Sequence, residues 1–420
     1  RRAGRRPPSG PSMTTLLAVN NYYYRRGGAE AVFLDHNRLF EAEGWRVVPF
    51  AMRHPRNLAS PWADYFVEEI EYGRRYSLGD RLVRVPKVVY SFEARRRLAA
   101  LLDRVRPDAA HAHNVYHHLS PSVLWALHAR GVPTVLTLHD LKIACPAYTM
   151  LAPDGVCERC RGGRLYEVVR HRCLKGSLPL SLVAYAEATL HRRLRTYERC
   201  VARLVVPSRF YATRLAEWGI ASAKLVHVPN FVAAGDYEPR YAPGRRFVYV
   251  GRLVREKGVA TLIRAAARAG VGVRVIGAGP ESQALQSLAR TLAANVEFTG
   301  HLVGPALRDA IAGARAVVLP SEWYENAPLA LLEAYALGKP VIGAHIGGIP
   351  ELIREGETGT AFASGSVDEL AARLVEFASR PDDQLAALGA EARRVAETEY
   401  SPRRYRERIL DVYRDAGLAA

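Results

Sequence analysis

The chain has 420 residues, of which 49% are hydrophobic and 24% are charged, and its formal net charge is +17. This length and apolar content suffice for two domains of about 200 residues, each with its own core, and they exclude a largely disordered protein. The sequence lacks an apolar run of the ~18 residues needed to span a bilayer and lacks the apolar core of a signal peptide, so we expect a cytoplasmic protein.

Residues 1–12 are mostly Arg, Pro, Gly and Ser, a composition that predicts a disordered extension ahead of Met13, or residues upstream of the natural start. Positive charge is concentrated in the first half: residues 1–200 carry 32 Lys and Arg against 18 Asp and Glu, whereas residues 201–420 carry 27 against 24. A one-sided basic field suits an anionic partner, such as an acidic membrane surface, a lipid phosphate or a nucleic acid. An Arg-rich compositional bias explains the same numbers equally well.

Short apolar runs with strand character alternate with amphipathic helical stretches along the chain. In the first half we expect strands at 14–20, 45–51, 108–113, 133–139 and 203–208, with a helix from about Gly28. A Gly-, Pro- and Tyr-rich stretch at 235–244, interpreted as a linker, lies between further strands at 224–230 and 246–251. Beyond it we expect strands at 271–279, 296–300, 315–321 and 340–345, and helices from Gly258, Pro280 and about Ala327. This alternation predicts an α/β protein with two doubly wound parallel sheets.

Two carboxylates stand out in the second half. Glu325 follows a predicted buried strand, Pro328 fits the first turn of the next helix, and Glu333 lies about two turns into it. At the carboxyl edge of a parallel sheet such carboxylates can hold the hydroxyls of a sugar and a ribose, because each accepts hydrogen bonds from vicinal diols. Taken alone, a Glu on an amphipathic helix is more often merely solvated.

The segment from Glu325 through Glu333 to Gly338-Lys339-Pro340-Val341-Ile342 resembles the signature of glycosyltransferase family 4, whose members have the GT-B fold. Further blocks match that family in order along the chain: 27–30, 111–113, 138–140, 247–253 with 256–258, 277–281, 298–300, 346–351 and 356–359. The resemblance runs from Met13 to the end. It implies two Rossmann-like doubly wound domains facing across a cleft, and a retaining glycosyltransferase that moves a hexose-type sugar.

We expect a first, acceptor-binding domain at 13–207 and a second, donor-binding domain at 208–395. A helix is predicted within 396–420 from its apolar stripe, and the resemblance implies that it packs back on the first domain.

The resemblance also assigns roles to single residues. Preorganised cations and helix N-terminal amides can stabilise the charge of a leaving nucleoside diphosphate, and this suits Arg252 and Lys257. The catalytic candidates are His113, Glu325, Arg252 and Lys257. The donor-binding candidates are Gly27, Gly28, Gly251, Arg252, Lys257, Gly277, Gly279, Glu325, Leu329, Ala330 and Glu333, and the acceptor-side candidates are His139 and Asp140.

No Asp-x-Asp triplet is present, so we expect metal-independent transfer with a nucleotide sugar as co-substrate. No carboxylate nucleophile emerges either. This favours front-face retention, in which a donor phosphate oxygen takes the acceptor proton, while a double displacement stays open. The expected donor is a UDP- or GDP-sugar, and the expected acceptor is a polysaccharide or a lipid-linked glycan.

The chain departs from the family after the first signature Glu. Members commonly carry Gly-Phe-Gly there, whereas this chain has Asn326-Ala327-Pro328. The amides of Leu329 and Ala330 can still reach a phosphate, but Pro328 has no amide hydrogen to donate. The pair Gly27-Gly28 lacks the third glycine of a dinucleotide fingerprint, so it does not indicate NAD.

A basic predicted helix suggests docking on an anionic membrane, at the inner face of the cell membrane. Its basic residues are Arg192, Arg193, Arg195 and Arg199, and its apolar residues are Leu182, Val183, Leu190 and Leu194.

Four cysteines cluster in a predicted insertion at 145–173, namely Cys145, Cys157, Cys160 and Cys173. Their spacing favours a tetrahedral structural zinc site, with unligated thiols or a regulatory disulfide as alternatives. Cys200 is left over and is predicted to be a buried thiol. The cluster resembles an insertion in a family 4 branch related to bacterial surface-polysaccharide synthesis. With the basic first half it also supports an alternative, a nucleic-acid-binding or regulatory protein, although the phosphate- and carboxylate-type positions argue against a nucleic-acid partner.

Overall fold

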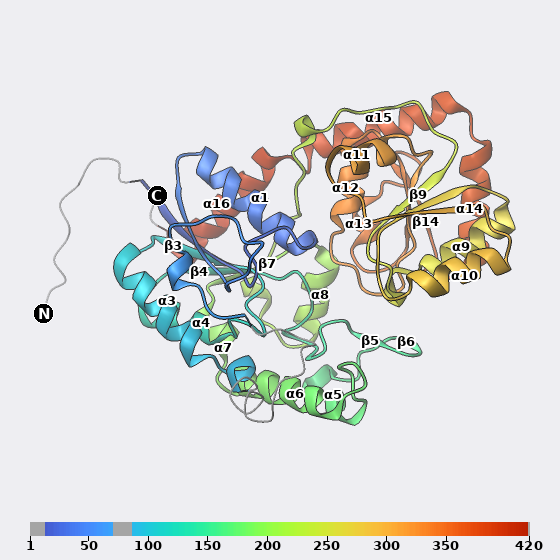
Figure 1. Cartoon of the computed structure of the whole chain (residues 1–420). Coiled ribbons are helices and arrows are strands. Elements are labelled where there is room, and N and C mark those ends of the chain that lie inside the picture. Colours follow the sequence, from blue (N-terminus) through green and yellow to red (C-terminus); the bar gives the residue numbers. More distant parts are fainter. Residues whose placement is uncertain (1–12, 70–85, 419–420) are drawn as a thin grey trace, which may run out of the picture. The chain divides into compact units, whose positions relative to one another are not determined.

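The structure, a computed structural model, describes residues 13–69 and 86–418, so the predicted extension at 1–12 lies outside the described residues. Two six-stranded sheets organise the chain, with strand orders β2-β1-β3-β4-β7-β8 and β11-β10-β9-β12-β13-β14 (Figure 1). Every pair in the second sheet is parallel, as are β1–β2, β1–β3 and β3–β4 in the first. Parallel neighbours need long crossovers, and here helices supply them. The doubly wound α/β prediction is confirmed.

The strands of the first sheet fall where the sequence predicts them. They are β1 (Thr15–Val19), β2 (Arg46–Phe50), β3 (Ala109–Ala112), β4 (Thr134–Thr137), β7 (Arg203–Val206) and β8 (Leu225–His227). The helices up to β8 are α1 (Gly28–Ala42), α3 (Phe92–Val105), α4 (Ser122–Ala129), α5 (Glu167–Arg170), α6 (Leu178–Arg193), α7 (Thr196–Cys200) and α8 (Arg209–Glu217). A small antiparallel hairpin, β5 (Leu151–Ala152) and β6 (Gly155–Val156), precedes α5.

The second sheet restarts the same alternation. Its strands are β9 (Phe247–Val250), β10 (Val273–Ile276), β11 (Val296–Gly300), β12 (Val317–Leu319), β13 (Val341–Ala344) and β14 (Gly359–Phe362). Its helices are α9 (Val259–Ala269), α10 (Ser282–Thr291), α11 (Gly304–Ala312), α12 (Leu329–Ala336), α13 (Ile349–Leu352), α14 (Val367–Ser379) and α15 (Asp382–Thr398), followed by α16 (Pro402–Ala416).

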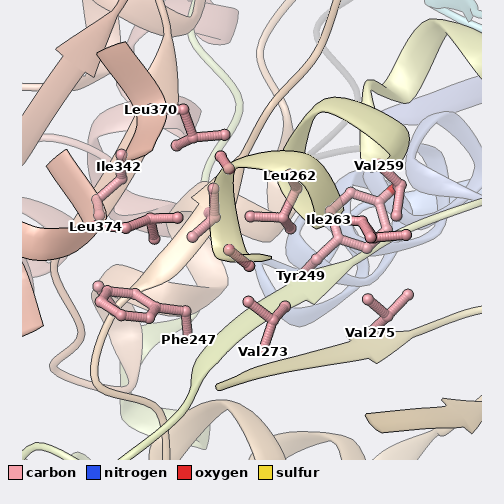
Figure 2. Close-up of a cluster of buried hydrophobic side chains, with 14 of the residues drawn as sticks. Phe247, Tyr249, Val259, Leu262, Ile263, Val273, Val275, Ile342, Leu370 and Leu374 are labelled. Carbon is pink, nitrogen blue, oxygen red and sulfur yellow. The ribbon is translucent and has the colours of Figure 1, made fainter. Parts of the chain in front are cut away.

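The largest apolar cluster of the second sheet lies where α9 and α14 cover the strands. Figure 2 shows Leu262 and Ile263 of α9 above Tyr249 on β9 and Val275 on β10, with Leu374 of α14 alongside. All five side chains are almost fully buried. Burying a large apolar side chain contributes about 1.5–3 kcal/mol, so this cluster holds the strand ends that carry the candidate site.

Contacts divide the chain into two compact units. The first unit comprises Arg1–Thr137, Ala186–Leu204 and Asp411–Ala420, and the second comprises Leu138–Tyr185 and Val205–Leu410. The end of α16 thus belongs to the first unit. There Tyr413 Oη lies 2.7 Å from His111 Nδ1 and 3.0 Å from His36 Nε2, so one buried hydroxyl links α16, β3 and α1.

One predicted helix is interrupted. The basic stretch expected to form a single helix is divided into α6 and α7, because Arg195 adopts a left-handed conformation with φ of 53°. Cys200 ends α7 and is buried, as predicted. Among the described residues, no helix is both long enough and apolar enough to cross a bilayer.

Candidate functional site

The second-unit donor candidates gather at one edge of the second sheet. Gly251 and Arg252 follow β9, Gly277 and Gly279 follow β10, and the loop 320–328 follows β12. Because the carboxyl ends of parallel strands meet at one edge, residues far apart in sequence become neighbours there. The backbone shows this directly, since the Gly251 amide donates to Ile276 O at 3.0 Å and the Leu253 amide donates to Ala278 O at 3.0 Å.

Two glycines make this crossing of loops sterically feasible. A Cβ on Gly277 would lie 1.8 Å from the carbonyl oxygen of Gly251, and the residue has a φ of +147°. A Cβ on Gly279 would lie 2.2 Å from Leu253 O. Only glycine permits so close an approach of the two turns, which fits the predicted Gly-rich loop.

We expect Gly277→Ala to lower the free energy of unfolding by about 1–3 kcal/mol, because it combines backbone strain with overpacking. Gly235→Ala is the matched control, since a Cβ there meets nothing within 4 Å and its φ is ordinary. Denaturant unfolding of both variants measures the difference. Equal stabilities would show that the two turns are not held together as described.

The centre of the site is a largely buried ion pair. Lys257 Nζ lies 2.5 Å from Glu325 Oε1, and the two side chains are 20% and 8% exposed. Lys257 ends the 3₁₀ turn Arg255–Lys257 directly before α9, and Glu325 lies in the loop before α12. The pair therefore joins the βα turns of β9 and β12.

Further donors surround the Glu325 carboxylate. Ser321 Oγ donates to Oε1 at 2.7 Å, and Trp323 lies close enough to lower the pKa of the carboxyl group, although its indole Nε1 has no hydrogen-bond partner within the described residues. Burial alone would raise the pKa of Glu325, but Lys257 and these donors outweigh it and hold the pKa below its ordinary value of 4.5. Glu325 is therefore ionised at neutral pH. Ser321 and Trp323 were not predicted, although both lie within four residues of Glu325.

The backbone around Glu325 is fixed from two sides. The Gly348 amide donates to Glu325 O at 2.8 Å, and a Cβ on Gly347 would lie 2.3 Å from the same oxygen. Asn326 takes the position where the family commonly has glycine. Its side chain accepts from Ser208 Oγ at 2.9 Å and donates to Leu138 O at 2.9 Å, so this departure from the family pattern fixes the loop by hydrogen bonds.

Helix α12 starts slightly later than predicted. Pro328 is its N-cap, with ψ of 122°, rather than part of the first turn, because a proline ring suits an extended residue before the helix. Glu333 consequently lies little more than one turn into α12, not two. Leu329 and Ala330 open the helix, where amides have no intrahelical acceptor and can bind an anion.

The acceptor-side candidates lie in the second unit, beside the loop that carries Glu325. His139 and Asp140 follow Leu138, whose carbonyl accepts from Asn326. Burial lowers the pKa of His139 to about 4, so its imidazole is neutral at pH 7. Tyr211 interacts electrostatically with both Asp140 and Glu325, and its hydroxyl donates to Tyr324 O at 2.9 Å. Arg252, in contrast, has an exposed side chain.

The remaining candidates belong to the first unit. Gly27 is the N-cap of α1 and Gly28 its first residue, and both are exposed. His113 follows β3 and is only 1% exposed. Its ring stacks on that of His111, with the ring centroids 4.7 Å apart, and packs edge-on against that of Phe33, with the centroids 5.2 Å apart. The structure thus places His113 at a strand end, as predicted, but packed inside the unit.

The four clustered cysteines line one small pocket in the second unit. All are free thiols. Within residues 13–69 and 86–418, no group of three or more His, Cys, Asp or Glu side chains is arranged to hold a metal ion.

Comparison with known proteins decides the family. The sequence model described as Glycosyltransferase Family 4 matches residues 26–235, half of the chain, and the one described as Glycosyl transferases group 1 matches residues 238–395. The chain belongs to glycosyltransferase family 4. Membership in family 4 confirms the predicted enzyme class, a glycosyltransferase, and decides against a non-enzymatic regulatory protein.

One relative and two solved structures align over most of this family 4 chain. Alpha-D-kanosaminyltransferase of Streptomyces kanamyceticus is 25% identical over 320 residues, which are 74% of this chain and 76% of that protein. Sucrose-phosphate synthase from Thermosynechococcus elongatus aligns with a TM-score of 0.71 at 17% identity, over 97% of this chain and 100% of that one. HepE of Anabaena, solved with UDP-glucose, aligns with a TM-score of 0.64 at 16% identity, over 96% and 99%. The structural likeness confirms the α/β GT-B fold.

Proposed function

We propose that this family 4 enzyme transfers a hexose-type sugar from a UDP- or GDP-sugar to a polysaccharide or a lipid-linked glycan, with retention of configuration. The observation that carries the proposal is the buried Lys257–Glu325 pair at the carboxyl edge of the second sheet. An ammonium group held in place by a carboxylate, together with the first amides of α12, suits a diphosphate, whose negative charge grows as the glycosidic bond breaks.

Each donor candidate then has a physical role. Lys257, Arg252 and the amides of Leu329 and Ala330 bind the diphosphate without a metal ion. Glu333 accepts from the ribose hydroxyls and Glu325 from the sugar hydroxyls. The glycines Gly251, Gly277 and Gly279 let the diphosphate approach the backbone, and the resemblance gives Gly27 and Gly28 a similar role.

Transfer proceeds on one face of the sugar. The bond from the anomeric carbon to the diphosphate oxygen breaks, the bond to the acceptor oxygen forms on the same face, and the acceptor proton passes to a donor phosphate oxygen. NMR of the product formed from an α-linked donor should show an α-linkage. A β-linkage would contradict retention.

The roles of His113 beside the transferred sugar and of His139 and Asp140 toward the acceptor stay predictions.

The donor can be identified by thermal stability. The neighbouring HepE structure contains UDP-glucose, which supports a uridine nucleotide. We expect one nucleotide sugar among UDP- and GDP-linked hexoses to stabilise the protein in the presence of EDTA, by about 2.7 kcal/mol at 100 times its dissociation constant. If no nucleotide sugar shifts the unfolding transition at millimolar concentration, the proposed donor site is wrong.

The exposed side chains of α6 favour a membrane-associated glycan as the acceptor. Leu178, Leu180 and Leu182 on α6 are 42%, 39% and 47% exposed, and the same helix ends in the exposed Arg192 and Arg193. Exposed apolar side chains at one end of a helix and arginines at its other end suit an anionic lipid surface. Binding to acidic vesicles should weaken as salt is added and should be absent with neutral vesicles. Failure to bind acidic vesicles at low ionic strength would favour a soluble acceptor. A location at the inner face of the membrane stays a prediction.

A further inference from the structure

The local fold brings the four clustered cysteines together. The hairpin of β5 and β6 reverses the chain after Cys145, so that the Cys157 amide donates to Met150 O at 2.7 Å. Cys160 follows one turn later. Helix α5 then returns the chain, and the Cys173 amide donates to Val168 O at 3.0 Å. All four side chains consequently line the same pocket.

The pocket that the four cysteines share suits a soft cation. Cys145 and Cys160 are buried, Cys157 is half-buried, and Cys173 is exposed. Most of the cluster therefore lies away from solvent, and apolar side chains complete the lining of the pocket. Four cysteine sulfurs are a common ligand set of structural zinc.

The neighbouring side-chain cations are partly engaged elsewhere. Lys142 Nζ donates to Pro146 O at 2.8 Å, and Arg159 pairs with Asp154 at 3.1 Å. His171 lines the pocket but its Nε2 lies 3.2 Å from a Glu167 carboxylate oxygen. Lys142 and Arg159 also act electrostatically on Cys145 and Cys173, so these two cations divide their interactions between oxygen atoms and the cluster.

We propose that Cys145, Cys157, Cys160 and Cys173 bind one structural zinc ion. The Cys-x-x-Cys turn supplies two ligands, and the segments before the hairpin and after α5 supply one each, to be drawn in to Zn–S distances of about 2.3 Å. Since the described side chains do not form a closed ligand set as they stand, binding requires the four sulfurs to move inward. Four thiolates leave no position for water, so this zinc orders the chain and takes no part in sugar transfer.

The Cys157–Cys160 turn of the proposed zinc site contacts the loop 320–328, which carries Glu325. Glu158 lies inside the Cys157–Cys160 turn, and its Oε1 accepts from Tyr324 Oη at 3.0 Å and pairs with Arg214 Nη1 at 3.3 Å. Tyr324 immediately precedes Glu325. By ordering the turn, zinc fixes Glu158 and so supports the loop that carries the signature carboxylate.

Metal analysis of the full chain, purified without added zinc, tests the proposal. We expect about one zinc per chain in the wild type and in Cys200→Ser, whose cysteine lies outside the cluster, and loss of zinc in Cys157→Ser. In case Cys157→Ser does not fold, titration of the native wild type with an organomercurial should release zinc in step with the modification of the cluster thiols. Either a zinc content near zero with all cluster thiols freely titratable, or an intact mass lower by two hydrogens that indicates a disulfide, would overturn the proposal.

Discussion

Lys257→Met is expected to lower kcat/KM for sugar transfer by about 10²–10³, the usual cost of removing one preorganised electrostatic donor. The methionine keeps the length of the side chain but has no charge to offset the leaving diphosphate. Lys224→Met, which removes a lysine from the turn Ser222–Lys224 and not from the candidate site, is the control for loss of one positive charge. Steady-state kinetics in EDTA measure both. If Lys257→Met turned over within a few-fold of the wild type, Lys257 would not be a donor-binding residue.

Glu325→Gln is expected to lower the free energy of unfolding by about 3–5 kcal/mol, because it leaves the Lys257 ammonium largely buried without its partner. The double variant Lys257→Met/Glu325→Gln buries no charge in the pair. It should therefore recover part of the lost stability while remaining inactive, a non-additivity that denaturant unfolding can measure. A single variant as stable as the wild type would show that the pair is solvated.

The same pair makes stability depend on pH. The pKa of Glu325 is lower in the folded protein than in the unfolded chain, so its contribution is fully present above the ordinary value of 4.5. As the pH falls through the folded pKa, the carboxylate takes up a proton and the contribution is lost. The double variant lacks this group and should lose less stability than the wild type on acidification.

The sequence predicted the elements that local patterns encode. Buried strands such as β1 and β9 and the helix starts at Gly28 and Gly258 follow from apolar runs and glycines, and the order of family blocks located the Lys257–Glu325 loops. What it missed depends on contacts between distant segments. Asn326 reaches Ser208 and Leu138 across more than 100 residues, and Tyr324 reaches Glu158 across 166. No periodicity or motif encodes such pairs, because each joins segments that are far apart in the sequence.

Burial at strand ends was equally inaccessible from the sequence. The position of His113 after β3 was predicted, but its packing against His111 and Phe33 depends on how α1 covers the sheet. The sequence also gives no indication of the helix break at Arg195, because arginine is a good helix former. Its left-handed conformation is imposed by the surrounding fold.

Release of nucleoside diphosphate from nucleotide sugars tests the central claim most directly. The wild type, incubated in EDTA with UDP- and GDP-hexoses, should release diphosphate from at least one donor, if only slowly with water as acceptor, and Lys257→Met should do so about 10²-fold more slowly. Equal rates in the two proteins, or neither release nor binding with any donor, would contradict a nucleotide-sugar site at the Lys257–Glu325 pair.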